Sequence, residues 1–344
     1  RPPTSTRDSI RRQRQMCIRD STLLCIIAAG CGANDDHWSE ERIPTRAEFR
    51  GICFIDPERG FVVGGDYFID GGLIGTTGDG GRTWSFQSGL VRAKAGFSLN
   101  DVVFLDRFVG VAAGSHGVIL RTTDRGRNWH AARPYTGGTD HFHDLFFLDE
   151  RLGWAVGFNG VIHTTDGGKS WSWLGKRKAI AGDAIHFFDP EQGLVAGKHG
   201  RISMTIDGGE TWVPVTDPDE TGTHDLLTMT FFGPMRGWAG GTDGAVLRTN
   251  DGGRSWKRHA TGARGRISDL AFVSLNRGWA LAADRSSSRS VILDTTDGGE
   301  TWREDRIVEG ELLRALATFG ETHAWAAGER PEHGDQVLMR YRAD

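Results

Sequence analysis

Short apolar segments recur along this chain at a nearly constant interval, and glycines separate them. A representative unit contains Gly153-Trp-Ala-Val-Gly157 and then Gly160-Val-Ile-His-Thr-Thr165. Runs this short, bounded by glycines, are typical of β-strands joined by tight turns. A phenylalanine opens each unit, and a glycine follows it six residues later. These pairs are Phe54 and Gly60, Phe104 and Gly110, Phe147 and Gly153, Phe187 and Gly193, Phe231 and Gly237, and Phe272 and Gly278.

The third strand of each unit runs into a turn such as Thr164-Thr-Asp-Gly-Gly-Lys-Ser-Trp171, which we call the Asp-box turn. Six such turns end in tryptophans spaced 41 to 46 residues apart, namely Trp84, Trp129, Trp171, Trp212, Trp256 and Trp302. A period of 40–50 residues with strand-like content is that of a four-stranded propeller blade. Each unit therefore predicts strands A, B and C, an Asp-box turn, and strand D.

The geometry of the Asp-box turn accounts for the residue types found in it. Adjacent glycines permit a tight reversal with positive φ. The carboxylate is expected to accept backbone N–H groups inside the turn, and the tryptophan to bury a large apolar area between blades. Six near-copies in a ring cannot all form one active site, so we interpret these aspartates as structural. They are Asp79, Asp124, Asp166, Asp207, Asp251 and Asp297.

A seventh unit begins at Leu313 and contains strands A to C without an Asp box. Residues 37–42 precede the first strand A and carry Trp38 where an Asp-box tryptophan would fall. We expect this segment to supply the missing strand D, which would close the ring and leave no open sheet edge. The prediction for residues 37–344 is an all-β, seven-bladed β-propeller of four-stranded blades.

The residues before the propeller predict export. We expect residues 1–21 to be a non-native or artefactual leader, residues 22–31 a signal and lipobox segment, and residues 32–36 a short linker. The apolar run ends in Ala29-Gly30-Cys31, so Cys31 is the expected lipidation site, and the alternative is an ordinary signal peptide with a chance cysteine. These features predict a lipoprotein that is located in the periplasm or on the outer surface. Cys53 would then have no disulfide partner.

Composition narrows the classes of function. Aromatic residues make up 10% of the chain and include 12 tryptophans, whereas disordered chains lack aromatics. The 49 glycines fit many short strands joined by tight turns. A net charge of −4 gives no basic excess for bulk nucleic-acid binding. We expect a monomer that uses no cofactor and binds a protein partner, either a membrane-protein subunit or an envelope complex.

The blade from Phe147-Leu-Asp149 through Gly153-Trp-Ala-Val-Gly157 to Thr165-Asp-Gly-Gly-Lys-Ser-Trp171 resembles the repeat of the photosystem II stability/assembly factor family. Asp boxes also occur in sialidases and in sortilin-type receptors. The resemblance covers about residues 37–344. It implies a single exported propeller, in the thylakoid lumen if the host is photosynthetic, that acts as a non-enzymatic scaffold. Photosynthetic members bind a newly made reaction-centre subunit and display an arginine-rich surface.

Strand direction separates two faces of the predicted ring. Asp-box and A–B turns share one face, and the B–C and D–A connections share the other, which carries nearly all the variation in loop length. Variable loops on a rigid scaffold are where binding usually occurs. Basic residues cluster in these loops, which predicts a docking face for an acidic partner, with ordinary solvated loop charge as the alternative. The partner-binding candidates are Arg92, Lys94, Lys176, Arg177, Lys178, Arg258, Arg264 and Arg266.

Polar residues at the starts of strand A are expected to ring the mouth of the central channel on that same face. An Asp/His cluster can hold a metal or a polar ligand, and more often it only solvates a channel entrance, so no metal site is predicted. The channel-mouth candidates are Asp101, His143, Asp144, Asp183, Asp225 and Asp269.

Two other functions were weighed. A sialidase-like hydrolase needs a tyrosine nucleophile and an arginine triad, and the tyrosines here are Tyr67, Tyr135 and Tyr341. Sialidase propellers also have six blades. A carbohydrate-binding module would show more aromatics than Phe97, Tyr135 and Phe142 on the loop-rich face. The sequence therefore favours a charged protein–protein face.

Overall fold

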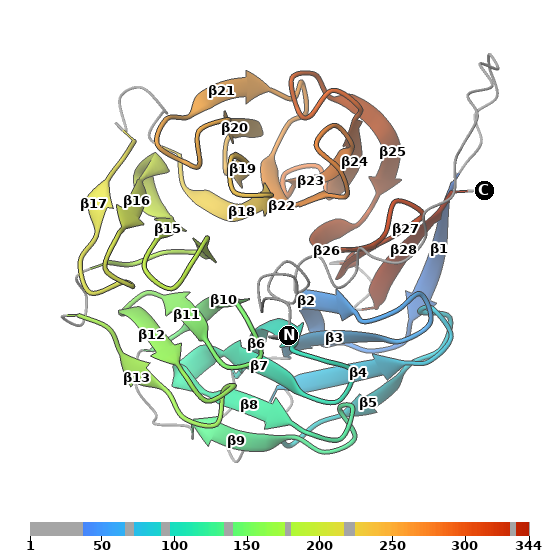
Figure 1. Ribbon diagram of the computed structural model, residues 1–344. Helices are drawn as coiled ribbons and strands as arrows, with labels where there is room; N and C mark the ends of the chain where they lie inside the picture. The colour runs from blue at the N-terminus through green and yellow to red at the C-terminus, as the bar shows by residue number, and fades with distance from the viewer. Residues whose placement is uncertain are drawn as a thin grey trace, which may run out of the picture.

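Seven antiparallel sheets of four strands each surround a central axis in the computed structural model (Figure 1). The structure describes residues 37–65, 72–90, 97–133, 140–175, 180–216, 224–330 and 335–343. In each sheet strand A is innermost and strand D outermost, which is the predicted seven-bladed propeller. The all-β class and the blade count are both confirmed.

The first three blades follow the chain in order from strand A to strand D. Blade 1 contains β2 (Glu48–Phe54), β3 (Gly60–Gly65), β4 (Leu73–Thr77) and β5 (Ser85–Gln87). Blade 2 contains β6 (Leu99–Phe104), β7 (Gly110–Gly114), β8 (Ile119–Thr122) and β9 (His130–Arg133), with the 3₁₀ turn η1 (Ser115–Gly117) between β7 and β8. Blade 3 contains β10 (Phe142–Phe147), β11 (Gly153–Gly157), β12 (Gly160–Thr164) and β13 (Ser172–Trp173).

Three further blades repeat this order. Blade 4 contains β14 (Ala184–Phe187), β15 (Gly193–Ala196), β16 (Ile202–Thr205) and β17 (Val213–Pro214), with η2 (Lys198–Gly200) between β15 and β16. Blade 5 contains β18 (Leu226–Phe232), β19 (Arg236–Gly241), β20 (Ala245–Thr249) and β21 (Lys257–Ala260). Blade 6 contains β22 (Arg266–Phe272), β23 (Gly278–Asp284), β24 (Arg289–Thr295) and β25 (Arg303–Glu309).

Blade 7 joins the two ends of the described chain. It contains β26 (Leu312–Phe319), β27 (His323–Glu329), β28 (Gln336–Arg342) and, as strand D, β1 (Trp38–Ile43). Trp38 pairs with Tyr341, and Figure 1 shows the blue β1 beside the red β28. Tyr341 occupies the register position at which Thr77 enters the Asp box of blade 1. Trp38 therefore stands where an Asp-box tryptophan would, as predicted.

The phenylalanine and glycine of each unit form one packing device. A Cβ atom on any of the six glycines would lie 2.3 to 2.8 Å from the ring of its own phenylalanine. A closest approach under 3.0 Å leaves no room for a side chain, so strand B can cross the ring only at glycine. The six-residue spacing thus encodes a close contact between strands A and B.

The Asp-box turns have the predicted hydrogen bonds. Oδ1 of Asp166 accepts the Ser170 backbone N–H at 3.0 Å, and Oδ2 accepts the Ser170 hydroxyl at 2.6 Å. The Thr164 hydroxyl donates to Oδ1 at 2.8 Å. The two glycines that follow Asp166 have φ values of 74° and 78°, which favour glycine. The carboxylate therefore stabilises its own turn.

Apart from Trp129, the tryptophans that fill the core are not those of the Asp boxes, which corrects the sequence expectation. Of the six Asp-box tryptophans only Trp129 is buried, because these side chains begin the outermost strand and border solvent. The fully buried tryptophans stand at the second or third residue of strand B; they are Trp154, Trp238, Trp279 and Trp325.

Strand-B tryptophans connect neighbouring blades. Trp238 stacks on Phe272 of the next blade with 3.4 Å between ring centroids, and its indole N–H donates to the Gly298 carbonyl at 2.8 Å. Trp325 makes the same contacts with Phe54 and with the Gly80 carbonyl. Trp238 and Trp325 therefore each contact the Asp-box turn of the following blade.

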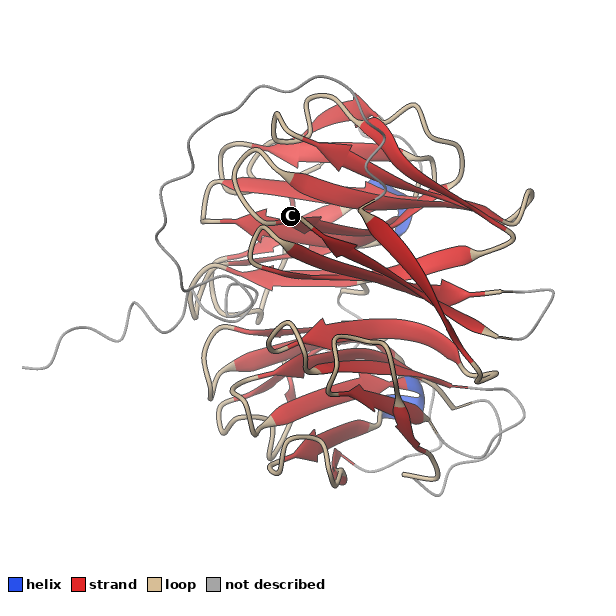
Figure 2. Cartoon of the chain, turned by 90° about the vertical axis from the view of Figure 1, so that its right-hand side faces the viewer, coloured by secondary structure: helices blue, strands red, loops and turns tan. Residues whose placement is uncertain are grey.

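Hydrogen bonds between turns support the assignment of the faces. The Gly80 N–H of an Asp box donates to the Glu58 carbonyl of an A–B turn at 2.7 Å. On the opposite face Asn159 of a B–C turn donates to Asp140 of a D–A connection at 2.9 Å. Figure 2 shows both 3₁₀ turns, drawn blue, on the same side of the ring.

Candidate functional site

The inner strands enclose a central channel with a cavity of about 250 Å³. Cys53 lines its wall, and enclosure by the surrounding strands raises the pKa of this thiol to about 12. A second cavity of about 340 Å³ lies at the loop-rich end of the channel. It shares Arg50, His143 and Arg314 with the first cavity, so the two are continuous.

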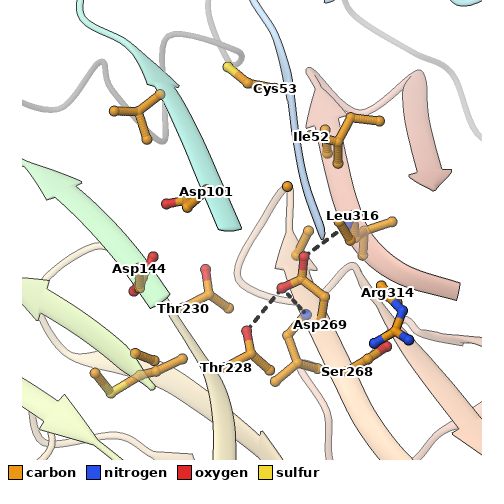
Figure 3. Close-up of a pocket in the computed structure, with 18 of the residues that line it drawn as sticks. Ile52, Cys53, Asp101, Asp144, Thr228, Thr230, Ser268, Asp269, Arg314 and Leu316 are labelled. Atoms are coloured by element: carbon orange, nitrogen blue, oxygen red, sulfur yellow. Dashed lines mark hydrogen bonds between the residues drawn. The ribbon is translucent and has the colours of Figure 1, made fainter. Parts of the chain in front are cut away.

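Three predicted channel-mouth aspartates connect adjacent blades. Asp101 accepts the Leu145 backbone N–H at 2.9 Å, and Asp144 accepts that of Ile185 at 2.8 Å. Asp269 accepts the Leu316 N–H at 2.8 Å and the Thr228 hydroxyl at 2.9 Å, as Figure 3 shows. These three carboxylates line the channel and also satisfy backbone donors of the neighbouring blade.

Of the other three predicted members, two pair with each other and one pairs with residues outside the predicted set. The His143 imidazole lies 2.7 Å from Asp183 at the channel mouth. Asp225 lies outside the channel lining, where it accepts the Lys198 ammonium at 2.8 Å and the His199 N–H at 3.0 Å. The Lys198 hydrogen bond lowers the pKa of Asp225. Five of the six candidates thus line the central channel and Asp225 does not, and the described residues contain no group of three or more such side chains placed to hold a metal.

Arginines dominate one side of the channel mouth. Arg50 lies 3.1 Å from Glu48, and Arg314 lies 3.8 Å from the same carboxylate. Arg314 also forms an ion pair with Glu329, which Arg285 approaches to 3.8 Å. Figure 3 shows Arg314 beside the channel. We call Arg50, Arg266, Arg285 and Arg314 the arginine mouth.

Arg266 is the least compensated member of the arginine mouth. Burial, and then the positive charges of Arg314 and Arg285, lower its pKa to about 10. Its Nε has no hydrogen-bond partner among the described residues. Four guanidinium groups therefore share two carboxylates, Glu48 and Glu329. A partly desolvated excess of positive charge attracts an anionic group.

Arg50 and Arg314 were missed in the sequence. Arg50 lies four residues before Phe54, as Asn100 lies four residues before Phe104 and His143 four before Phe147. Comparing the residue four positions before the strand-A phenylalanine in every blade would have identified Arg50. Aligning strand A of blade 7 with the other blades would have identified Arg314 at the same position. Arg266 was predicted, and it begins β22 at the mouth.

The other predicted basic residues do not share one location in the structure. Arg92, Lys94, Lys176, Arg177 and Lys178 lie outside the described residues, and so does Cys31. Arg258 was expected in a loop, but it belongs to strand β21, because the chain continues its pairing with strand C (β20) after the Asp box. Arg258 forms an ion pair with Asp243. Arg264 is exposed on the D–A connection.

The tyrosines offer little to the hydrolase alternative. Tyr341 is buried and accepts a hydrogen bond from Arg277 at 2.6 Å, at the seam between blades 6 and 7. Tyr67 and Tyr135 lie outside the described residues.

No helix among the described segments has the length and apolar character needed to span a bilayer.

The fold and its turns define a seven-bladed Asp-box β-propeller. The sequence model of the family described as photosynthesis system II assembly factor YCF48 matches residues 32–136 and 176–264. The chain belongs to that family.

Similar proteins include photosystem II assembly lipoprotein Ycf48 of Synechococcus sp. (strain CC9902), 29% identical over 162 residues. That match covers 43% of this chain and 43% of the relative. Another is the chloroplastic photosystem II stability/assembly factor HCF136 of Arabidopsis thaliana, 29% identical over 92 residues, which are 27% of this chain and 22% of the relative. The chain thus matches less than half the length of either relative.

Two solved structures share the fold. YCF48 bound to D1 peptide superposes with a TM-score of 0.70 at 22% identity, covering 89% of this chain and 97% of the other. YCF48 from Cyanidioschyzon merolae gives a TM-score of 0.69 at 20% identity, covering 89% and 98%.

Proposed function

We propose that this protein is a non-enzymatic assembly scaffold that holds an acidic segment of a protein partner on its loop-rich face, with the arginine mouth at the centre of the contact. The observation that carries the proposal is the charge balance on the side of the mouth formed by blades 1, 6 and 7, where four arginines share two carboxylates. An incoming carboxylate would offset the burial and the repulsion from Arg314 and Arg285 that lower the pKa of Arg266.

The placement of these arginines favours a specific contact. Arg50, Arg266 and Arg314 stand on the inner strands β2, β22 and β26, which the blades on both sides hold in place. Guanidinium groups on a rigid support lose little freedom on binding, and they recognise carboxylates with two parallel hydrogen bonds. The exposed Arg264, and the predicted Arg92, Lys94, Lys176, Arg177 and Lys178, would extend the basic surface around the mouth.

The relatives support a partner of this kind. One solved YCF48 is bound to a D1 peptide, and we infer that this chain likewise binds a peptide segment of a membrane-protein subunit. We further propose that the chain is exported, tethered to a membrane through Cys31, and monomeric. A lipid tether would keep the scaffold near the membrane surface where such a subunit is assembled.

The proposal is tested by measuring fluorescence anisotropy of a labelled D1 peptide with the full chain. Replacing Arg50 and Arg266 by glutamine should weaken binding at least ~10-fold and flatten its salt dependence, because two charge-assisted contacts are removed. The matched control is Arg254→Gln, an exposed arginine of an Asp-box turn on the other face. Equal affinity for the double variant and the control would overturn the proposal.

A second variant examines the outer loops. Changing Lys176, Arg177, Arg258 and Arg264 together to glutamate should abolish capture of the same peptide, because like charges would then surround the acidic segment. Unchanged capture would restrict the contact to the mouth and would remove these loops from the proposal.

A further inference from the structure

Strand A carries a β-bulge at the same repeat position in six of the seven blades. At each bulge the pairing with strand B shifts by one residue, and one residue of strand A is left unpaired. Bulges re-aim side chains and are common beside binding sites. All six unpaired residues line the cavity of about 340 Å³ at the channel mouth. They are Arg50, Asn100, His143, Leu227, Ser268 and Arg314.

The chemistry of these bulge residues changes around the channel. Blades 7 and 1 are neighbours in the ring, and they contribute Arg314 and Arg50, which belong to the arginine mouth. Blade 5 contributes Leu227, which is half-buried and lines both cavities of the channel. The same repeat position therefore supplies positive charge from one side of the mouth and an apolar side chain from another.

Phe158 adds an aromatic ring to the same cavity. It is the first residue of the B–C turn of blade 3, directly after β11, and 50% of its surface is exposed. Blades 2, 4 and 5 have the polar residues Ser115, Lys198 and Thr242 at this position. The turn therefore does not require an apolar residue there, and exposing a phenyl group to water is unfavourable.

Contacts within blade 3 fix the position of Phe158. The rings of His143 and His141 meet it edge-on, with ring centroids 4.4 and 5.7 Å away. Its backbone N–H donates to the His141 carbonyl at 3.3 Å. The His143 imidazole in turn lies 2.7 Å from Asp183. An aromatic ring that is already held in place loses little freedom when a ligand packs against it.

The apolar and the charged groups occupy different sides of one cavity. Figure 1 shows β10 of blade 3 and β26 of blade 7 on opposite sides of the channel axis. Phe158 therefore lies across the mouth from Arg314, and blade 5, with Leu227, lies between blades 3 and 6. A ligand that fills this cavity meets guanidinium groups at one end and apolar side chains at the other.

We propose that the mouth selects a partner segment in which an acidic residue stands next to a large apolar one. The carboxylate binds to the arginine mouth, and the apolar side chain packs on Phe158 and Leu227. This inference rests on the proposed function, and it adds a requirement that charge alone would not impose. Burial of the apolar side chain supplies affinity that salt does not screen.

The probes are two acetylated and amidated peptides of equal charge, Ser-Glu-Glu-Phe-Ser and Ser-Glu-Glu-Ser-Ser. The dissociation constant of each with the full chain is measured by isothermal titration calorimetry. We expect the peptide with phenylalanine to bind at least ~10-fold more tightly, because its phenyl group leaves water on binding. Added salt should weaken both peptides and leave this preference in place.

Two substitutions remove the apolar contact with residues that the repeat already uses. Phe158→Ser introduces the residue of blade 2 at that turn position, and Leu227→Ser introduces the residue of blade 6 at the bulge. Together they should reduce the preference to ~2-fold or less, and each alone should reduce it in part. The matched control is Phe108→Ser, which removes an exposed phenylalanine from an A–B turn on the Asp-box face. The thermal midpoint reports whether each variant remains folded.

The outcomes separate this inference from the proposed function. Equal binding of the two peptides by the unsubstituted chain would overturn the inference and leave the proposed function standing. The same holds if the Phe158→Ser, Leu227→Ser variant keeps the preference that Phe108→Ser shows. The Arg50→Gln, Arg266→Gln double variant should weaken both peptides alike. If it weakens neither, the proposed function fails, and this inference fails with it.

Discussion

Replacing Trp238 by alanine tests how the blades are held together. The side chain is fully buried, stacks on Phe272 with 3.4 Å between ring centroids, and donates to the Gly298 carbonyl. Removing a buried tryptophan costs ~3–5 kcal/mol, and the orphaned carbonyl adds ~1 kcal/mol. The expected loss of unfolding free energy is therefore ~4–6 kcal/mol.

Trp256→Ala is the matched substitution in an Asp box of the same blade. That indole is only half-buried, faces Phe231 edge-on, and donates within its own turn to Gly253. Partial burial predicts a smaller cost, roughly 1–2 kcal/mol.

The assay is the thermal midpoint followed by circular dichroism. At ~2 °C for each kcal/mol in a chain of this size, Trp238→Ala should fall by ~8–12 °C and Trp256→Ala by ~2–4 °C. Equal shifts, or a larger shift for Trp256→Ala, would refute the assignment of the inter-blade contact to strand B.

Three further outcomes are expected. Hydrogen bonds with Asn128 and Thr211 lower the pKa values of Asp124 and Asp207 to about 2; since the folded pKa lies below the unfolded value of 3.8, this stabilisation is present above pH ~4 and is lost as the pH falls toward 2. The thermal midpoint should fall over that window, and less so in Asp124→Asn. Cys53 should react slowly with a thiol reagent at pH 8 in the folded chain and rapidly in urea, because its pKa of about 12 keeps it protonated; equal rates would contradict this. Sialyl and aryl glycosides should not be hydrolysed, and turnover of either by the purified chain would revive the hydrolase alternative.

The repeat could be predicted from the sequence because each of its residues meets a local steric or hydrogen-bonding demand. The glycine at Gly153 is needed by the ring of Phe147, and the Asp166 carboxylate by its own turn. Closure by Trp38 was also accessible, since its partner Tyr341 holds a position that the repeat defines. These constraints act within one blade.

Contacts between blades were harder to predict. Asp101 and Asp269 resemble free ligands in the sequence, yet each accepts a backbone N–H of the following blade more than 40 positions away. Burial of the tryptophans was misassigned for the same reason, because Trp238 meets its partner only across the seam. The arginine mouth combines blades 1, 6 and 7, which only ring closure brings together.

Photo-cross-linking of a benzophenone-labelled D1 peptide to the full chain, followed by mass spectrometry, locates the contact on which the proposed function depends. We predict cross-links at the first residues of β2, β22 and β26, around Arg50, Arg266 and Arg314, and their loss in the Arg50→Gln, Arg266→Gln double variant. Cross-links confined to the Asp-box face, or an unchanged pattern in the double variant, would contradict the account.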